Sequence, residues 1–118
     1  MTNLYGLRIL LIEDEPIVAV LAEDMLEAIG CMTVATVATI ADAQAAMAAI
    51  PFDLAMVDIN LDGEDGLAIA DTLRDRGIPY LITTGYDAQG VAPGHPVLTK
   101  PYALSDLESA IRRCAFRT

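Results

Sequence analysis

The chain has 118 residues, is 54% hydrophobic and carries a formal net charge of −10, from 17 acidic and 7 basic residues. This size and composition indicate one domain with a full hydrophobic core and exclude a disordered chain. The acidic balance argues against nucleic acid as a partner, because phosphates would be repelled. The sequence has neither an apolar run of membrane-spanning length nor a secretory signal pattern, so we expect a cytoplasmic protein without a membrane partner.

Short apolar runs alternate with helical patterns along the chain. The runs, which we expect to be strands, are 8–12, 32–38, 54–57, 80–83 and 96–98. Most are continuously apolar, as expected of strands that are covered on both faces. This alternation predicts an α/β fold with one doubly wound parallel sheet, because right-handed crossovers place helices on both of its faces. We find no repeat or linker and predict a single domain over residues 1–118.

The first helical pattern covers residues 15–29 and has an apolar residue at every fourth position. Such a stripe is typical of a helix that packs on one face. Pro16 suits the first turn of this helix, and Gly30 suits its end. The residues of the stripe are Ile17, Leu21, Met25 and Ile29, with Val18, Ala22 and Leu26 beside them.

Further helices are predicted over 39–50 and 65–76, and a last one opens at Ser105. Thr39 with Asp42, and Ser105 with Glu108, have the spacing of a capping box, in which two side chains bond to the backbone of the first helical turn. Gly77 follows the 65–76 helix and suits its end.

Residues 85–95, GYDAQGVAPGH, separate the fourth and fifth apolar runs and contain three glycines and one proline. Glycine costs about 1 kcal/mol and proline about 3 kcal/mol at an interior helical position. We therefore predict that the fourth helix of the alternating pattern is shortened or replaced by a loop. His95, at the end of this segment, is expected to be a solvated loop residue.

Acidic residues follow two of the predicted strands. The first strand ends at Glu13 and Asp14, and the third ends at Asp58. Ligands of a parallel sheet bind beyond the carboxyl ends of its strands, so these carboxylates converge if the two strands are neighbours. Unpaired carboxylates about 4 Å apart repel by about 4 kcal/mol at an effective dielectric of 20. A divalent cation would relieve that repulsion, and oxygen ligands with room for water suit Mg²⁺.

Other polar residues have ordinary structural explanations. The remaining acids near these strands are expected at helix starts, where they favour the helix dipole, or in a turn. The two cysteines are far apart in sequence and match no metal spacing, so we expect buried free thiols. These residues are Glu15, Glu64 and Asp65 at helix starts, Asp62 in a turn with Gly63, and the cysteines Cys31 and Cys114.

Thr84 and Lys100 complete a chemical constellation at the same edge of the sheet. Thr84 ends the fourth strand, and Lys100, the only lysine, follows the fifth strand directly. A metal and an ammonium neutralise phosphoryl oxygens during transfer to a carboxylate, and a hydroxyl can hydrogen-bond the product. The set therefore indicates formation of an acyl phosphate on Asp58.

At these positions the chain resembles, over its whole length, the receiver domains of two-component response regulators. The resemblance implies a five-stranded CheY-like sheet in the order 2-1-3-4-5. It also implies that Thr84 and Lys100 sense a phosphoryl group, and that the Lys100–Pro101 bond is often cis in relatives. The motifs are Glu13-Asp14, Asp58, Thr84 and Lys100-Pro101, each at a predicted strand end.

The resemblance further implies the chemistry of the site and its partners. Asp58 would accept a phosphoryl group from a sensor histidine kinase or a phosphotransfer protein. Glu13, Asp14 and Asp58, with the backbone carbonyl of Asn60, would hold Mg²⁺ or Mn²⁺. The protein would not be an enzyme for other substrates, since it would catalyse only its own phosphotransfer and dephosphorylation and signal by contact with an unknown downstream protein.

Two departures from the usual receiver pattern indicate a subgroup of the family: the short loop over 85–95 replaces the usual fourth helix, and the aromatic switch residue is missing. Receivers usually carry an aromatic switch residue three positions before the lysine, and here Val97 occupies it. The segment 82–86, ITTGY, is similar to the motif Phe-Ala-Thr-Gly-hydrophobic-Tyr of an alphaproteobacterial single-domain subgroup, with Ile82 and Thr83 in place of Phe and Ala, and Asp87 in place of the last Tyr. This similarity implies a kinase of the HWE or HisKA2 type. Because Val97 provides no aromatic ring and residues 85–95 contain three glycines, we expect this segment to be the switch instead.

Alternative functions stay open at this point. A haloacid-dehalogenase-like phosphatase also uses Mg²⁺ and a strand-end Asp, but it needs a second Asp where Asn60 stands. A flavodoxin-like cofactor binder needs a phosphate loop after the first strand, where the acidic EDEP would repel phosphate. An interaction module without phosphorylation is the third. We expect a stand-alone regulator, with a receiver cut from a larger regulator or hybrid kinase as the alternative.

Overall fold

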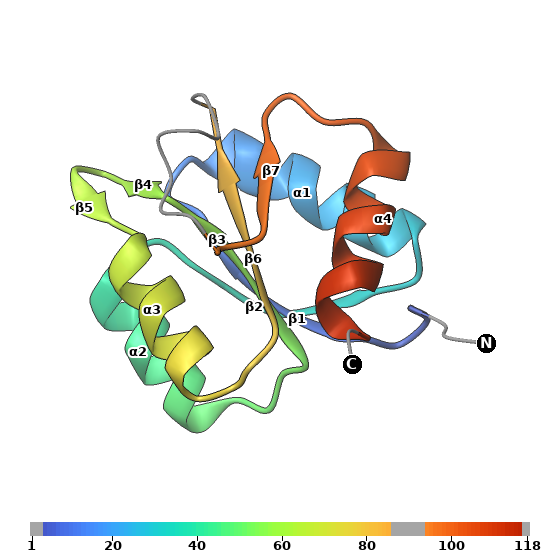
Figure 1. The fold of residues 1–118 in the computed structure, drawn as a ribbon. Helices are drawn as coiled ribbons and strands as arrows, with labels where there is room; N and C mark the ends of the chain where they lie inside the picture. The colour runs from blue at the N-terminus through green and yellow to red at the C-terminus, as the bar shows by residue number, and fades with distance from the viewer. Residues whose placement is uncertain (1–3, 86–93, 117–118) are drawn as a thin grey trace.

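A computed structural model describes residues 4–85 and 94–116 and contains a five-stranded parallel sheet (Figure 1). The strand order is β2-β1-β3-β6-β7. Counted along the chain, these strands are in the order 2-1-3-4-5, which confirms the predicted topology. The strands are β1 (Arg8–Ile12), β2 (Met32–Val37), β3 (Leu54–Asp58), β6 (Tyr80–Thr84) and β7 (Val97–Thr99).

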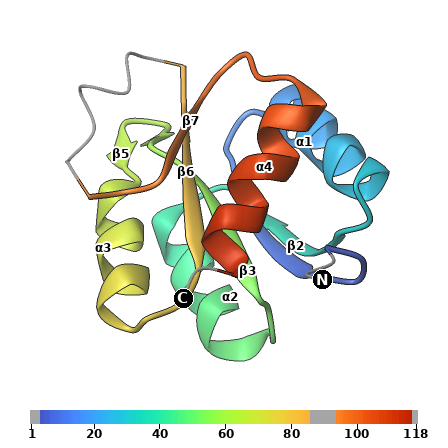
Figure 2. The same ribbon diagram turned by 45° about the vertical axis from the view of Figure 1, so that its right-hand side comes forward.

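Helices cover both faces of the sheet, as Figures 1 and 2 show. The helices α1 (Pro16–Ala28) and α4 (Leu104–Ala115) pack on one face, and α2 (Ile40–Ala49) and α3 (Leu67–Asp75) pack on the other. The predicted shortening of a helix concerns 86–93, which lie outside the described residues. Within the described ranges, no helix is long and apolar enough to cross a membrane.

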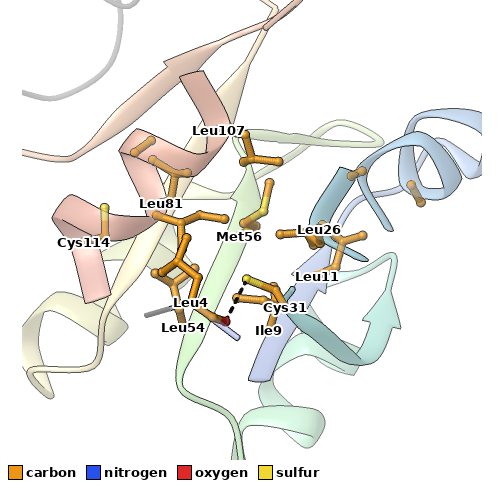
Figure 3. Packing of buried hydrophobic residues seen from close by; sticks show 14 residues of the cluster. Leu4, Ile9, Leu11, Leu26, Cys31, Leu54, Met56, Leu81, Leu107 and Cys114 are labelled. Carbon is orange, nitrogen blue, oxygen red and sulfur yellow. Dashed lines mark hydrogen bonds between the residues drawn. The ribbon is translucent and has the colours of Figure 1, made fainter. Parts of the chain in front are cut away.

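Each face of the sheet has its own buried cluster, because successive side chains of a strand point to opposite faces. On the α1/α4 face, Met56 of β3 and Leu81 of β6 pack against Leu26 and Leu107 of the two helices (Figure 3). Val57 and Ile82 belong to the cluster on the α2/α3 face. This assignment of faces fixes the direction of the side chains at the strand ends.

The cysteines are buried free thiols, as predicted. The Cys31 Sγ lies 3.7 Å from the backbone oxygen of Leu4, an interaction drawn in Figure 3. Burial, with a smaller contribution from Glu108, raises the pKa of the Cys31 thiol to about 11. The thiol is therefore neutral at physiological pH.

The packing face of α1 matches the predicted stripe only in part. Ile17 is 77% exposed and Leu21 is 57% exposed, whereas Ala19, Ala22 and Leu26 are buried. The prediction holds for Met25 and Ile29, which pack against the core, and is wrong for Ile17 and Leu21. It fails at these two residues because the helix is apolar around most of its circumference, so the period alone cannot choose a face. The small side chains of Ala19 and Ala22 face the sheet and allow the helix to approach it closely.

One half of one of the two predicted capping boxes is present at a helix start, namely the Thr39 side-chain cap of α2. The Thr39 hydroxyl accepts a hydrogen bond from the Asp42 N–H at 3.0 Å, which caps α2 as predicted. The Ser105–Glu108 box is wrong, because the residue that caps α4 is Ala103, two residues before Ser105, and the helix begins at Leu104. Its first turn is fixed by Asp106, whose carboxylate accepts from the Ala103 N–H at 3.0 Å.

A short hairpin, β4 (Asn60–Leu61) with β5 (Glu64–Asp65), follows β3 and was not predicted. Asp62 and Gly63 form its turn with φ values of 50° and 84°, as two-residue hairpin turns require. The predicted turn is thus confirmed, and the Asp-Gly pair was the signal for the hairpin. The Asp65 carboxylate accepts from the Leu67 N–H at 2.9 Å, at the start of α3 as expected.

Candidate functional site: a carboxylate and lysine cluster

The acidic residues that follow β1 and β3 lie together at the carboxyl edge of the sheet. These strands are neighbours, with Ile12 opposite Val57, so Glu13 and Asp58 emerge side by side. Oxygen atoms from Glu13, Asp14 and Asp58 all lie within 4.8 Å of one another. The predicted convergence of these three carboxylates is therefore what the structure shows.

Lys100 reaches this cluster from the end of β7, which lies two strands away from β3 in the sheet. Its Nζ lies 2.9 Å from Glu13 Oε1 and 3.5 Å from Asp58 Oδ2. The expectation of unpaired carboxylates was thus wrong, because Lys100 already offsets part of their mutual repulsion. The Lys100–Pro101 peptide bond is cis, as the family resemblance implied.

Burial dominates the electrostatics of Asp58, which is only 5% exposed. Loss of solvent and the neighbouring Glu13 raise the pKa of its carboxyl to about 6, against the opposing effects of Lys100 and the Asn60 N–H. That N–H donates to Asp58 Oδ1 at 3.1 Å. Burial by itself would lower the pKa of the Lys100 ammonium, but Glu13 and Asp58 outweigh it and raise that pKa. The lysine is therefore positively charged at physiological pH.

Thr84 lies at the end of β6 and is 1% exposed. Its backbone oxygen accepts a hydrogen bond from the Lys100 N–H at 2.7 Å, which ties the two predicted sensor residues together through their backbones. The Thr84 side chain alternates with that of Thr83, so it belongs to the same face of the sheet as Ile82 and Val97. The structure thus brings Thr84 to the same edge of the sheet as Lys100.

Gly66 is a site residue that sequence reasoning missed. A Cβ atom at this position would lie 2.2 Å from the backbone oxygen of Asp58. The Gly66 N–H also donates to the Ile59 backbone oxygen at 2.7 Å. Only glycine permits this approach of the α3 start to the end of β3, and the residues Asp65-Gly66 give no sequence signal that separates it from an ordinary turn.

The donor set suits a hard divalent cation. Three carboxylates offer closely spaced oxygen atoms at an edge where Asp14 remains partly exposed. Mg²⁺ prefers oxygen ligands and keeps several of its waters, so a small and partly open group of carboxylates fits it. The backbone carbonyl of Asn60 stays a predicted fourth ligand.

The domain is doubly wound, as its sheet order and helix layers show. At the carboxyl edge of its sheet it has an acidic site whose carboxylates pair with a lysine. A model of the response regulator receiver domain matches residues 9–112, and the chain belongs to that family. The predictions of family and fold are thereby confirmed.

Several relatives are similar to most of this chain. Transcriptional regulatory protein TcrA of Mycobacterium tuberculosis is 33% identical over 123 residues, which cover 95% of this chain and 47% of that protein. The chain thus spans about half the length of the curated relatives that it matches. The solution structure of SdrG from Sphingomonas melonis has a TM-score of 0.78 and 33% identity, covering 98% of this chain and all of that one.

Two further solved structures bear on the subgroup and on the metal. The response regulator PhyR from Brucella abortus has a TM-score of 0.83 and 29% identity, covering 97% of this chain and 49% of that one. Similarity to SdrG and PhyR agrees with the subgroup that the ITTGY motif indicated. The receiver domain of the sensor histidine kinase PA1611 from Pseudomonas aeruginosa, with magnesium in its active-site cleft, has a TM-score of 0.81 and 26% identity, covering 93% of this chain and 98% of that one.

Proposed function

We propose that residues 1–118 form a receiver domain that accepts a phosphoryl group on Asp58. The observation that carries the proposal is the position of this carboxylate, which ends a buried strand with Lys100 Nζ at 3.5 Å and two more carboxylates beside it. An Asp58 oxygen attacks phosphorus, the bond from phosphorus to the donor breaks, and the donor leaves with the bonding electron pair. The product is an acyl phosphate on Asp58, and no other covalent bond of the chain changes.

Each neighbour of Asp58 has a distinct part in this proposal. Lys100 neutralises charge on the phosphoryl oxygens, which it can do by releasing Glu13. Thr84 donates its hydroxyl to the phosphorylated product. Glu13, Asp14 and Asp58, with the Asn60 carbonyl, would hold Mg²⁺ or Mn²⁺, which would offset the negative charge of the phosphoryl group when bound.

Receiver domains are signalling phosphoacceptors, and their phosphoryl donors are histidine kinases or phosphotransfer proteins. For this chain we propose such a donor, of the HWE or HisKA2 type, on the strength of the ITTGY motif. The phosphorylated receiver would signal by contact with another protein. It would do so either as a stand-alone regulator or as a receiver within a longer chain. The loop switch proposed for residues 85–95 falls mainly on 86–93, outside the described residues.

Labelling by acetyl phosphate tests the proposal without knowledge of the kinase. The purified chain is incubated with the reagent and Mg²⁺, and phosphorylated protein is separated on a phosphate-affinity gel. We expect labelling of the wild type, loss of labelling when EDTA replaces Mg²⁺, and no labelling of Asp58→Asn, because an amide is a far poorer nucleophile. Equal labelling of the variant would refute the assignment, and steady turnover of small phosphoesters would favour the phosphatase alternative.

A further inference from the structure

Thr83 is a buried threonine on β6 that faces the phosphorylation site. It is 4% exposed and lies opposite Asp58 of β3 and Leu98 of β7 in the sheet. Residues opposite each other in neighbouring strands point to the same face, and residues next to each other along a strand point to opposite faces. Leu81 and Leu98 both belong to the α1/α4 cluster, so the Thr83 side chain points to that face.

The Lys100 side chain lies on the same face of the sheet as the Thr83 side chain. It comes two residues after Leu98, and its ammonium reaches Glu13 beyond β1. In the strand order β1-β3-β6-β7, the lysine side chain must cross the end of β6 to reach either carboxylate. The residue that continues this register beside Lys100, directly after β6, is Gly85, which has no side chain. Thr83 is therefore the nearest β6 side chain on the path of the lysine.

The Thr83 hydroxyl is available for a new contact. Within residues 4–85 and 94–116 this hydroxyl makes no hydrogen bond. Every side-chain oxygen or nitrogen atom there that is completely inaccessible to solvent has a hydrogen-bond partner, so the Thr83 hydroxyl is not completely inaccessible. A hydroxyl can accept a hydrogen bond from an ammonium, which has three donors to place. In the structure the Lys100 ammonium is closer to Glu13 than to Asp58, and Glu13 follows β1, which lies one strand further from β6 than β3 does. Movement back toward Asp58 brings it nearer to β6.

We propose that Thr83 is a positioning residue for Lys100. Its hydroxyl accepts a hydrogen bond from the ammonium once the ammonium leaves Glu13 for a phosphoryl group on Asp58. The proposal rests on the proposed function for its consequence, and it adds a residue to the site. Thr83 itself touches neither the phosphorus nor the leaving group. It favours the arrangement of Lys100 in which the positive charge lies beside Asp58.

The variants Thr83→Val and Thr83→Ser separate the hydroxyl from the shape of the side chain. Valine has nearly the same shape without the hydroxyl, and serine keeps the hydroxyl without the methyl group. We expect Thr83→Val to be labelled by acetyl phosphate about tenfold more slowly, the size typical of a lost hydrogen bond to a charged group. Thr83→Ser should be labelled at nearly the wild-type rate. Urea unfolding of both variants checks that the fold is intact.

A second readout does not need phosphorylation. Because Lys100 is the only lysine, ¹⁵N-lysine labelling gives one ammonium resonance. The Glu13→Gln background removes the competing ion pair, so there Thr83→Val should shift the resonance and Thr83→Ser should leave it in place. An unlabelled wild type would refute the proposed function, while the resonance would still decide the role of Thr83. Equal rates and equal resonances for the valine variant and its parent would overturn the inference.

Discussion

Lys100 Nζ lies 2.9 Å from Glu13 Oε1 and 3.5 Å from Asp58 Oδ2, so one ammonium serves the carboxylates of two strands. Both carboxylates are buried, with 5% of each residue exposed. The lysine is thus a structural counterion before any phosphoryl group arrives. A phosphoryl group on Asp58 would compete with Glu13 for it, which links the chemistry of the site to an ion pair at the end of the sheet.

Removal of the Lys100 charge should destabilise the metal-free protein. Lys100→Met keeps most of the length of the side chain but leaves two buried carboxylates without their cation. Breaking a buried ion pair in this way costs about 3 kcal/mol. Urea unfolding in EDTA measures the effect, and Arg113→Met, which removes an exposed cation from α4, is the control. A Lys100→Met variant as stable as the wild type would show that the ion pair does not compensate the acids.

Asp58→Asn should stabilise the metal-free protein at neutral pH. Because the carboxyl has a pKa of about 6 in the fold and an ordinary value of 3.8, the folded state binds its proton more tightly than the unfolded state. The stability contributed by that proton is complete below about pH 4 and is lost as the pH rises through about 6. The asparagine variant has no such loss, so it should gain about 1–3 kcal/mol above this window.

Asp53→Asn is the control for that experiment, since its sign is opposite. The Arg8 guanidinium forms a two-point ion pair with Asp53, with distances of 3.1 Å, and holds the pKa of that carboxyl below its ordinary value. Its stabilising effect is present at neutral pH and is lost as the pH falls through the lowered pKa. Asp53→Asn should therefore lose stability at neutral pH. If Asp58→Asn also lost stability there, the assigned cost of burying the Asp58 charge would be wrong.

Gly66→Ala should damage the site by contact with Asp58. A methyl group placed 2.2 Å from the Asp58 backbone oxygen must displace either the end of β3 or the start of α3. We expect a loss of about 2 kcal/mol in unfolding free energy, as for overpacked positions, and slower labelling by acetyl phosphate. Gly85→Ala provides the comparison, because a Cβ atom there meets nothing within 4 Å. Similar behaviour of the two variants would contradict the steric account.

His95 anchors the start of β7 at the sheet end opposite Asp58. Its side chain is fully buried, with Nδ1 2.6 Å from the Tyr80 hydroxyl oxygen and Nε2 3.2 Å from Asp71 Oδ1. The expectation of a solvated loop residue was therefore wrong. His95→Ala should cost about 2 kcal/mol of unfolding free energy, and a double-mutant cycle with Tyr80→Phe should give a coupling of about 1 kcal/mol. Strict additivity would mean that the two side chains do not stabilise each other.

The fold and the main cluster were predictable because each rests on a pattern local in sequence. Apolar runs that end on Glu13, Asp58 and Lys100 mark strand ends, and parallel strands must bring those ends to one edge. The failures concern information that only packing supplies. The buried side of α1 depends on the packing of Ala19 and Ala22 against the sheet. The position of His95 depends on Tyr80, which lies in a distant strand. Gly66 is needed because a side chain there would collide with a backbone atom of another element.

The central claim is that Asp58 carries the phosphoryl group, and the most direct test locates it chemically. The chain is treated with acetyl phosphate and Mg²⁺, reduced with borohydride, which converts an aspartyl phosphate to homoserine, and digested for mass spectrometry. The account predicts homoserine at position 58 in the treated wild type and unmodified aspartate at position 14 of the same sample. Homoserine at another aspartate, or none in a sample whose gel shows phosphorylated protein, would contradict it.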